Sequence, residues 1–195
     1  MALLRAFLAS EIPSPIQDGI QTATNGLRRE LGNDVIRWVP AYNIHLTLKF
    51  LGDVSESSLA MVKQMLTTEA AQYEVFNVQV EGFGCFPNAR RPRVLWVGLQ
   101  APPTLAALQH SVDAFAARLG YRAEERGYSP HLTIGRIRQD ASSANVQKIR
   151  CAVEQTKIGV LGTIQVRAVN LFKSELHSSG SVYTKLFSAP LIEHG

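Results

Sequence analysis

Cysteine is scarce in this sequence of 195 residues: only Cys85 and Cys151 occur, far apart and without CxxC spacing. A disulfide-held fold needs several closely spaced cysteines, and a structural zinc site needs cysteine or histidine ligands at characteristic intervals. Neither class is predicted here. Both thiols are expected to be free and buried.

Long hydrophobic runs are also missing, and none approaches the roughly 18 apolar residues of a membrane-spanning helix. The apolar N-terminal stretch "MALLRAFLASEIPSP" is short and contains Arg5 and Glu11. A secretory signal would need a longer apolar region and a small-residue cleavage site. We therefore expect this stretch to form the first strand of a cytoplasmic protein with no membrane partner.

Charged residues make up only 18% of the chain, with an excess of four positive charges. This mildly basic balance favours an anionic partner such as RNA or a phosphate ester, although many enzymes with neutral substrates share it. No P-loop and no GxGxxG pattern occurs, so the sequence predicts no cofactor and leaves a nucleotide effector open.

The hydrophobic pattern indicates both helices and strands. In 14–31 the apolar residues follow in steps of three and four, as in an amphipathic helix. With proline, glycine and serine as boundary signals, helices are predicted over 14–31, 55–72, 102–120 and 142–156, and strands over 3–9, 35–39, 43–51, 75–86, 94–99, 128–138, 162–176 and 180–190. The order predicts an α+β fold of antiparallel sheet with outer helices, in one domain over 1–195.

One short pattern, His-Leu-Thr followed by an aliphatic residue, occurs twice, in "NIHLTLKF" and in "SPHLTIGR". Each copy is followed by a helix and then by long strands, which resembles an internal duplication. Because residues two apart in a strand share a face, His45 and Thr47 point together, and so do His131 and Thr133. The aliphatic residues between and after them are expected to face the core.

Two such strands, brought face to face, would surround a small cleft with two imidazoles and two hydroxyls. Histidine titrates near neutrality, so one neutral and one protonated ring can act as base and acid in the same step. Threonine hydroxyls can donate hydrogen bonds to a central anion, and phosphate has oxygens for several donors. The set is suited to in-line phosphodiester chemistry.

A structural role and a metal-binding role are the alternatives for these histidines. A lone histidine on a strand is usually a hydrogen-bonded structural residue, but two copies of the same pattern on separate strands favour a function. Imidazole is also a common metal ligand. No HxH pair, HExxH motif or nearby carboxylate completes a metal site, and none is predicted.

These motifs and their flanks resemble the two-histidine phosphoesterase superfamily, whose signature is a pair of HxTx motifs. Within it, the chain is most similar to the bacterial and archaeal RNA 2′,3′-cyclic phosphodiesterases, also named 2′–5′ RNA ligases. The resemblance covers nearly the whole chain. "LLRAFLASEIP" looks like that branch's opening strand, "RPRVLWVGL" like its middle hairpin strand and "LFKSELHSSGSVYTKL" like its closing pair of strands.

The resemblance implies a bilobal fold, with two pseudo-symmetric lobes of antiparallel sheet, outer helices and the active-site cleft between the lobes. It implies metal-independent hydrolysis of a 2′,3′-cyclic phosphate to a 2′-phosphomonoester. Carried over by position, His45 is the proton donor to the departing O3′ and His131 the proton acceptor that activates water. Thr47 and Thr133 then bind the phosphate.

Two cations are further candidates for substrate binding. Arg136 lies five positions after His131, an odd offset that in an ideal strand points away from the cleft, although a bulge or the strand's end could return it. Members of the resembled family often carry an arginine here. Lys49 lies two positions after Thr47 and is expected to share the His45 face, at the cleft edge. Phe50 is expected to alternate into the core, although an edge position could let it stack on a base.

Several other residues are ambiguous or expected to be structural. The loop "NARRPR" brings Arg90, Arg91 and Arg93 together, either as an RNA backbone contact or as a solvated hairpin tip. Trp96 is expected in the core. The remaining histidines lack an HxT context and are expected outside the site: His110, His177 and His194.

The sequence thus favours an RNA 2′,3′-cyclic phosphodiesterase, acting as a monomer on RNA or oligonucleotide ends. Three alternatives stay open: 2′–5′ RNA ligation, hydrolysis of another small cyclic phosphodiester, or an RNA-binding module with weak activity. Both histidines and both threonines are intact, which disfavours the last.

Overall fold

Three of the four helices begin and end near the boundary signals of the sequence. The helix predicted over 55–72 is shorter, because Ser55 caps a 3-10 turn over Glu56–Ser58 and the α-helix begins only at Leu59. The helices are α1 (Ser14–Leu31), α2 (Leu59–Ala70), α3 (Pro103–Arg118) and α4 (Ser143–Gln155). Pro15 lies in the first turn of α1, and Gly32 ends that helix with a φ of 70°, a conformation that glycine adopts without strain. The Ser142 side chain accepts a hydrogen bond from the Asn145 N–H and so caps α4.

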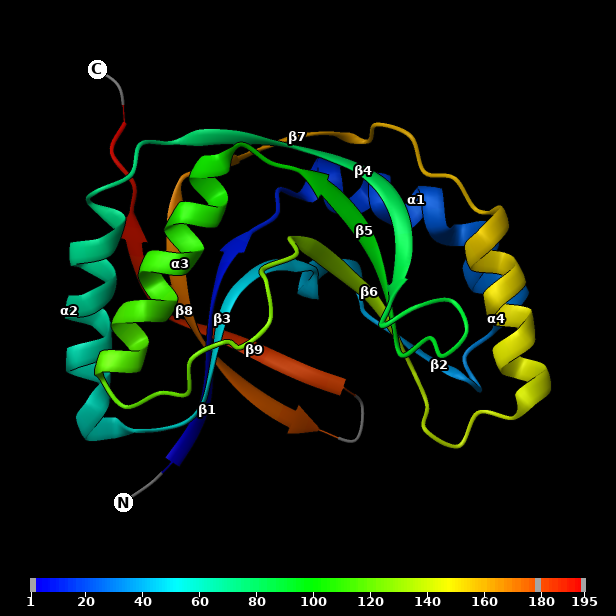
Figure 1. Ribbon diagram of the computed structural model, residues 1–195, viewed down its shortest axis with the longest axis horizontal. Helices are drawn as coiled ribbons and strands as arrows, with labels where there is room; N and C mark the ends of the chain where they lie inside the picture. The colour runs from blue at the N-terminus through cyan, green and yellow to red at the C-terminus, as the bar shows by residue number, and fades with distance from the viewer. Residues whose placement is uncertain (1–2, 178–179, 194–195) are drawn as a thin grey trace.

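The computed structural model describes residues 3–177 and 180–193, and within them all the strands join one curved sheet (Figure 1). The strands are β1 (Leu3–Glu11), β2 (Ile36–Trp38), β3 (His45–Ser55), β4 (Phe76–Phe86), β5 (Val94–Gln100), β6 (His131–Ile137), β7 (Gly162–Val166), β8 (Ala168–His177) and β9 (Gly180–Pro190). Every strand pairing is antiparallel, and the predicted α+β class is confirmed.

The strand order reveals a pseudo-two-fold relation. It runs β7-β4-β5-β6-β3-β1-β8-β9, with β2 also paired to β6. The strands of the two HxTx motifs, β3 and β6, are therefore central, and equivalent strands follow on either side. Helices α2 and α3 pack on β3, β8 and β9, whereas α1 and α4 pack on β7 and β4 (Figure 1). We name these halves the His45 lobe and the His131 lobe; the expectation of two pseudo-symmetric lobes is confirmed.

The single strand predicted over 162–176 is wrong, because two strands occupy this range. β7 pairs with β4 in the His131 lobe, and β8 pairs with β1 and β9 in the His45 lobe. The chain changes lobes at the exposed Arg167. The buried side chains mark the change, since their alternation shifts by one residue between Val166 and Val169.

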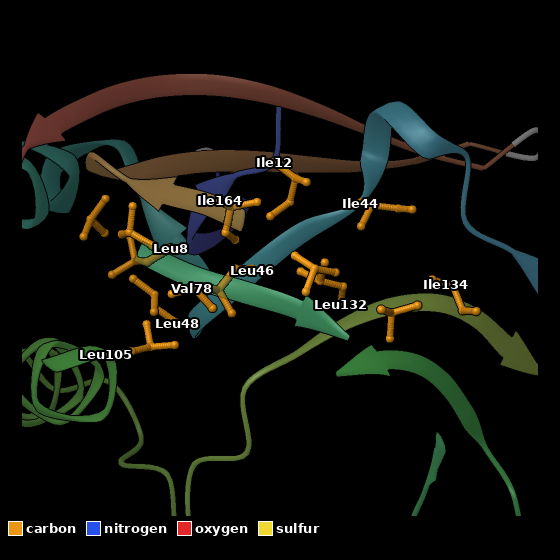
Figure 2. Close-up of a cluster of buried hydrophobic side chains, with 14 of the residues drawn as sticks. Leu8, Ile12, Ile44, Leu46, Leu48, Val78, Leu105, Leu132, Ile134 and Ile164 are labelled. Carbon is orange, nitrogen blue, oxygen red and sulfur yellow. The ribbon is translucent and has the colours of Figure 1, made fainter. Parts of the chain in front are cut away.

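The core is continuous across both lobes. Figure 2 shows Leu46 and Leu48 of β3 in one cluster of buried side chains with Leu132 and Ile134 of β6, as the alternation predicts. A second, small cluster of Phe7, Ala9 and Phe172, with Tyr183 against it, is separate from this core.

The two cysteines and the helix lengths can be compared with the sequence expectations. Both cysteines are free as predicted, but neither is fully buried: Cys85 is partly exposed and Cys151 is exposed on α4. Among the helices of the described residues, none has the length and apolarity required to cross a membrane.

Candidate active site

The two HxTx motifs lie side by side at the centre of the sheet. β3 and β6 pair at Leu46 and Leu132, which are both fully buried. The residues on either side of this pair are partly buried and lie on the opposite face: His45, Thr47, His131 and Thr133. Because the strands are antiparallel, each histidine lies beside the threonine of the other motif. The histidines occupy one diagonal of this group and the threonines the other, with Cα atoms roughly 7–8 Å apart in a regular sheet.

Both imidazoles are held in the same way by the backbone two residues earlier. The His45 Nδ1 lies 2.7 Å from the Asn43 carbonyl oxygen, and the His131 Nδ1 lies 2.8 Å from the Ser129 carbonyl oxygen. A carbonyl only accepts, so each Nδ1 carries a hydrogen and donates it. This leaves Nε2 of each ring as the nitrogen that can exchange a proton with a ligand.

Aromatic rings from neighbouring strands support each imidazole. The His45 ring centroid lies 4.8 Å from that of Phe7 and 5.3 Å from that of Tyr183. The His131 ring meets Phe86 edge-on at 4.9 Å. Such packing restricts the rotamers of both histidines and fixes the direction of their Nε2 atoms.

The two threonine hydroxyls remain available for a ligand. Within the described residues, neither the Thr47 nor the Thr133 hydroxyl forms a hydrogen bond; Thr47 takes part only through its carbonyl, which accepts from Tyr128 at 3.1 Å. Two hydroxyl donors and two Nε2 atoms therefore share one face of the sheet.

A bulge in each motif strand breaks the alternation at the same place. The strands have the same burial pattern, in which the fifth residue after the histidine is exposed. In β6 the pairing with β5 shifts between Leu95 and Trp96, and this returns Arg136 to the histidine face. Arg136 therefore lies on the histidine face, the outcome that the sequence made conditional on a bulge or the strand's end.

The equivalent bulge in β3 exchanges the expected positions of Lys49 and Phe50. The pairing of β3 with β1 shifts between Thr47 and Lys49. Phe50, expected in the core, is 59% exposed and packs on Phe7 with ring centroids 5.9 Å apart. It is the pseudo-symmetric counterpart of Arg136.

The expectation that Lys49 lies at the cleft edge is therefore wrong. Its side chain is only 5% exposed, and its ammonium forms an ion pair with Asp113 and donates to the Arg122 carbonyl oxygen. Asp113 also accepts from the Glu124 N–H. A lysine held in this way ties β3 to α3 and to the segment that leads into β6, and its charge is already neutralised.

Burial and a neighbouring charge lower the pKa of both site histidines. For His45, burial is the largest cause, partly offset by the bond to the Asn43 carbonyl; the positive charges of Arg136 and His131 lower the pKa further. For His131, burial again dominates, the Ser129 carbonyl opposes it and Arg136 adds to it. Both rings therefore favour the neutral form in the free protein, and a bound anion would favour the protonated form.

A pocket of about 330 Å³ is lined by His45 together with residues of β1, β8, β9 and the turn before β3. Aromatic residues line much of it, including Phe7, Tyr42 and Tyr183. Glu11 and Lys185 also line it, and they form an ion pair of 2.7 Å. Its size and mixed lining suit a planar group attached to a polar one.

Sequence reasoning missed the aromatic residues around the histidines. Trp96, expected in the core, pairs with Thr133 and lies 5.3 Å from the Phe86 ring, on the face opposite the buried Leu95 and Val97. A side chain at Gly84 would collide with its indole, so that glycine makes room for it. The alternation of "VLWVGL" carried this signal, since Trp96 occupies the phase opposite Leu95, Val97 and Leu99.

The other histidines lie apart from the site. His110 on α3 and His177 at the end of β8 are exposed, and His194 lies outside the described residues. In the part of the chain that the structure describes, no three His, Cys, Asp or Glu residues gather as metal ligands.

Comparison with known proteins agrees with this arrangement. The family described as LigT like Phosphoesterase matches the chain twice, over residues 11–96 and 97–183, so that each match contains one HxTx motif. An RNA 2′,3′-cyclic phosphodiesterase of Methanothermobacter thermautotrophicus is 33% identical over 183 residues, covering 94% of this chain and 96% of its own. The enzyme of the same name from Aquifex aeolicus is 28% identical over 187 residues, covering 94% and 95%.

Solved structures show the same fold. A Thermus thermophilus protein superposes with a TM-score of 0.79 at 25% identity, covering 96% of this chain and 98% of its own. Escherichia coli LigT, crystallised with 3′-AMP, superposes with a TM-score of 0.75 at 25% identity, covering 97% and 99%. With both halves of the sequence matched and its relatives covered almost end to end, the chain belongs to the LigT-like phosphoesterase family.

Proposed function

We propose that this protein hydrolyses RNA 2′,3′-cyclic phosphate ends to 2′-phosphomonoesters by metal-independent acid–base catalysis. The observation that carries the proposal is the pair of imidazoles on one diagonal, each fixed through Nδ1, with two unpartnered hydroxyls on the other. The names of the relatives support the substrate class. Crystals of E. coli LigT with phosphate and with 3′-AMP support phosphate binding in this family.

The cyclic phosphate would lie over Leu46 and Leu132, at the centre of the four motif side chains. Thr47 and Thr133 donate to its non-bridging oxygens, and the Arg136 guanidinium neutralises the charge that grows on them in the transition state. Because the threonines lie on the diagonal between the histidines, the reacting axis from nucleophile to leaving oxygen follows the other diagonal, as an in-line displacement requires.

The pocket beside His45 supports the division of roles between the histidines. The leaving O3′ stays attached to the ribose, so the proton donor must be on the nucleoside side of the phosphate. The aromatic pocket adjoins His45 and can receive that nucleoside. His45 is therefore the proton donor and His131 the proton acceptor, in agreement with the roles that the family resemblance implies.

The proton balance needs no metal. A water oxygen attacks phosphorus while the His131 Nε2 takes one of its protons. The bond from phosphorus to O3′ breaks, and the His45 Nε2–H gives its proton to O3′, which leaves a ribose 3′-hydroxyl and a 2′-phosphate. Afterwards His131 loses a proton to solvent and His45 gains one. The anionic substrate supports the protonated form of His45, which is disfavoured in the free protein.

The direct test uses a short RNA ending in a 2′,3′-cyclic phosphate, with EDTA present and the product compared with 2′- and 3′-phosphate standards. We expect a 2′-phosphate product. His45→Ala and His131→Ala should each lower turnover by about 10²–10⁴-fold, the usual contribution of a general acid or base. The matched control is His110→Ala, which removes an exposed histidine on α3 and should leave the rate unchanged.

Three outcomes would count against the proposal. Loss of activity in EDTA would point to a metal, and loss of folding in either histidine variant would indicate a structural role. A rate that stays flat between about pH 5 and pH 9 would exclude a mechanism with one neutral and one protonated imidazole. A product joined to a 5′-hydroxyl RNA, in place of a free 2′-phosphate, would instead identify 2′–5′ ligation as the main reaction.

A further inference from the structure

Arginines continue outward from Arg136 on the His131 lobe. Arg37 of β2 pairs directly with Arg136, and the neighbouring pair, Ile36 and Ile137, is buried. Both arginine side chains therefore leave the sheet on the histidine face, opposite the core. Arg138 follows two residues after Arg136, is exposed, and donates its N–H to the Val35 carbonyl oxygen at 2.8 Å.

The loop between β4 and β5 brings three more arginines to the same end of β6. The Asn88 side-chain oxygen accepts from the N–H of Arg90 and of Arg91, at 3.0 and 3.1 Å, which orders the turn. The Ile137 N–H donates to the Arg93 carbonyl oxygen at 2.9 Å and ties the loop to β6. In Figure 1 this loop lies beside β2. We call the exposed set the arginine surface: Arg37, Arg90, Arg91, Arg93 and Arg138.

The positive charge of this surface is uncompensated. Within residues 3–177 and 180–193, none of its members forms an ion pair with a carboxylate. Elsewhere the exposed cations are commonly paired, as Arg150 is with Glu154 and Arg167 with Glu193. The carboxylates nearest in sequence, Asp34 and Asp140, are fewer than the arginines. Such a cluster attracts a polyanion more strongly than it attracts a single phosphate.

We infer that the arginine surface binds the backbone phosphates of the RNA chain on the 5′ side of the terminal nucleotide. The inference rests on the proposed function, since it needs a nucleoside in the pocket beside His45. Tyr42, which lines that pocket, lies in the short turn Ala41–Asn43 between β2 and β3 and is 77% exposed. β2 immediately precedes this turn in the chain, and the proposed RNA path runs from the pocket past Tyr42 to Arg37 of β2, and then to Arg138 and the loop.

The binding is electrostatic and independent of sequence, because guanidinium groups on an open surface contact phosphates and not base edges. The protein is then built for polynucleotide ends in preference to cyclic mononucleotides. A cyclic mononucleotide places its nucleoside in the pocket and its phosphate among the four motif side chains. It has no further phosphate that the arginine surface could bind.

The test compares two substrates, adenosine 2′,3′-cyclic phosphate and a short oligoribonucleotide that ends in the same cyclic nucleotide. The variant Arg90→Gln/Arg91→Gln/Arg93→Gln should lower kcat/KM for the oligonucleotide by about tenfold at low salt and leave that for the mononucleotide within about twofold. It should also flatten the salt dependence for the oligonucleotide by roughly 0.7 logarithmic units per lost phosphate contact. Arg37→Gln/Arg138→Gln should act in the same direction.

The matched control, Arg118→Gln/Arg150→Gln/Arg167→Gln, removes three charges from other parts of the surface and should change neither substrate's kcat/KM. If the loop variant and this control behave alike, or if both substrates lose activity equally, the inference is overturned. If the unchanged protein hydrolyses neither substrate, the proposed function fails instead. In that case RNA binding by the arginine surface is tested through the affinity of the protein for an oligoribonucleotide that ends in a 2′-phosphate. The loop variant must weaken this affinity, and the control variant must not.

Discussion

At the scale of single residues, Arg136 influences both imidazoles of the site. Its positive charge lowers the pKa of His45 and of His131, in addition to burial. Both pKa values therefore lie below the ordinary 6.5 in the free protein. The proton donor is lost as the pH rises through its own pKa, so the alkaline limb of kcat/KM should lie below pH 6.5. The value of kcat/KM should therefore increase as the pH falls from neutrality toward the pKa of His45.

Removing the Arg136 charge should move this profile in a known direction. In Arg136→Gln both histidine pKa values rise toward the ordinary value, so the alkaline limb shifts to higher pH even though the rate falls by about a hundredfold through lost transition-state stabilisation. Arg136→Lys keeps the charge and should keep the limb in place, while losing rate because it lacks the bidentate geometry. Proton NMR titration of the two imidazoles and the kcat/KM profile measure the shift independently.

An unchanged titration of both rings in Arg136→Gln would mean that the guanidinium is too distant or too solvated to act on them. In that event Arg136 would be a surface cation and not a phosphate ligand. A shift of the same size in Arg136→Lys would point to altered packing as the cause.

The four motif residues could be identified from the sequence because they depend only on local alternation. A strand places residues two apart on one face, whatever its neighbours, so His45 with Thr47 and His131 with Thr133 followed directly. The aromatic support could not be identified in this way. Phe7 and Phe86 reach the imidazoles from other strands, and the pairing of those strands is a property of the tertiary structure.

At the scale of elements, the errors in the sequence analysis occur where a strand departs from regular geometry. The bulges in β3 and β6 shift the alternation by one residue, which buries Lys49 and exposes Phe50. A bulge depends on how the neighbouring strand pairs, so one strand's sequence does not predict it. The sequence analysis also joined β7 and β8 into one strand over 162–176, although the buried residues change phase at Arg167.

The buried ion pair of Lys49 should prove structural when it is broken. Lys49→Met leaves the Asp113 carboxylate without its cation and should lower the free energy of unfolding by about 3–5 kcal/mol. Adding Asp113→Leu should recover part of that loss, since the unpaired buried charge is removed. Denaturant unfolding of the two variants measures both effects.

The original expectation for Lys49 makes the opposite prediction. A cleft-edge lysine would raise KM for RNA when replaced by Met and would leave stability within about 0.5 kcal/mol of the parent. Finding that combination would contradict the buried position. Because Asp113 also holds the Glu124 N–H, ahead of His131, we expect any kinetic effect of Lys49→Met to fall on cyclic mononucleotide and RNA substrates alike.

At the scale of the whole molecule, neither lobe consists of one continuous half of the chain. The first family match, 11–96, contains β3 and α2 of the His45 lobe together with α1 and β4 of the His131 lobe. The second match is divided in the same way, with α3 in the His45 lobe and β6, α4 and β7 in the other. The four motif side chains lie where the lobes join, on either side of the pairing of Leu46 with Leu132. Two interleaved lobes with one core should unfold together, as the expected single domain over 1–195 requires.

The distribution of tryptophan makes this cooperative unfolding measurable. Both tryptophans, Trp38 on β2 and Trp96 on β5, belong to the His131 lobe, so fluorescence reports on that lobe while far-ultraviolet circular dichroism reports on both. We expect the two signals to give one coincident transition.

Leu132→Ala, at a fully buried position, should lower the free energy of unfolding by about 2–5 kcal/mol and shift both signals equally. Leu176→Ala, at a position 66% exposed, is the control and should change stability by less than about 0.5 kcal/mol. A circular dichroism transition with no counterpart in fluorescence would mean that the His45 lobe unfolds by itself, and the chain would then contain two domains that share an active site.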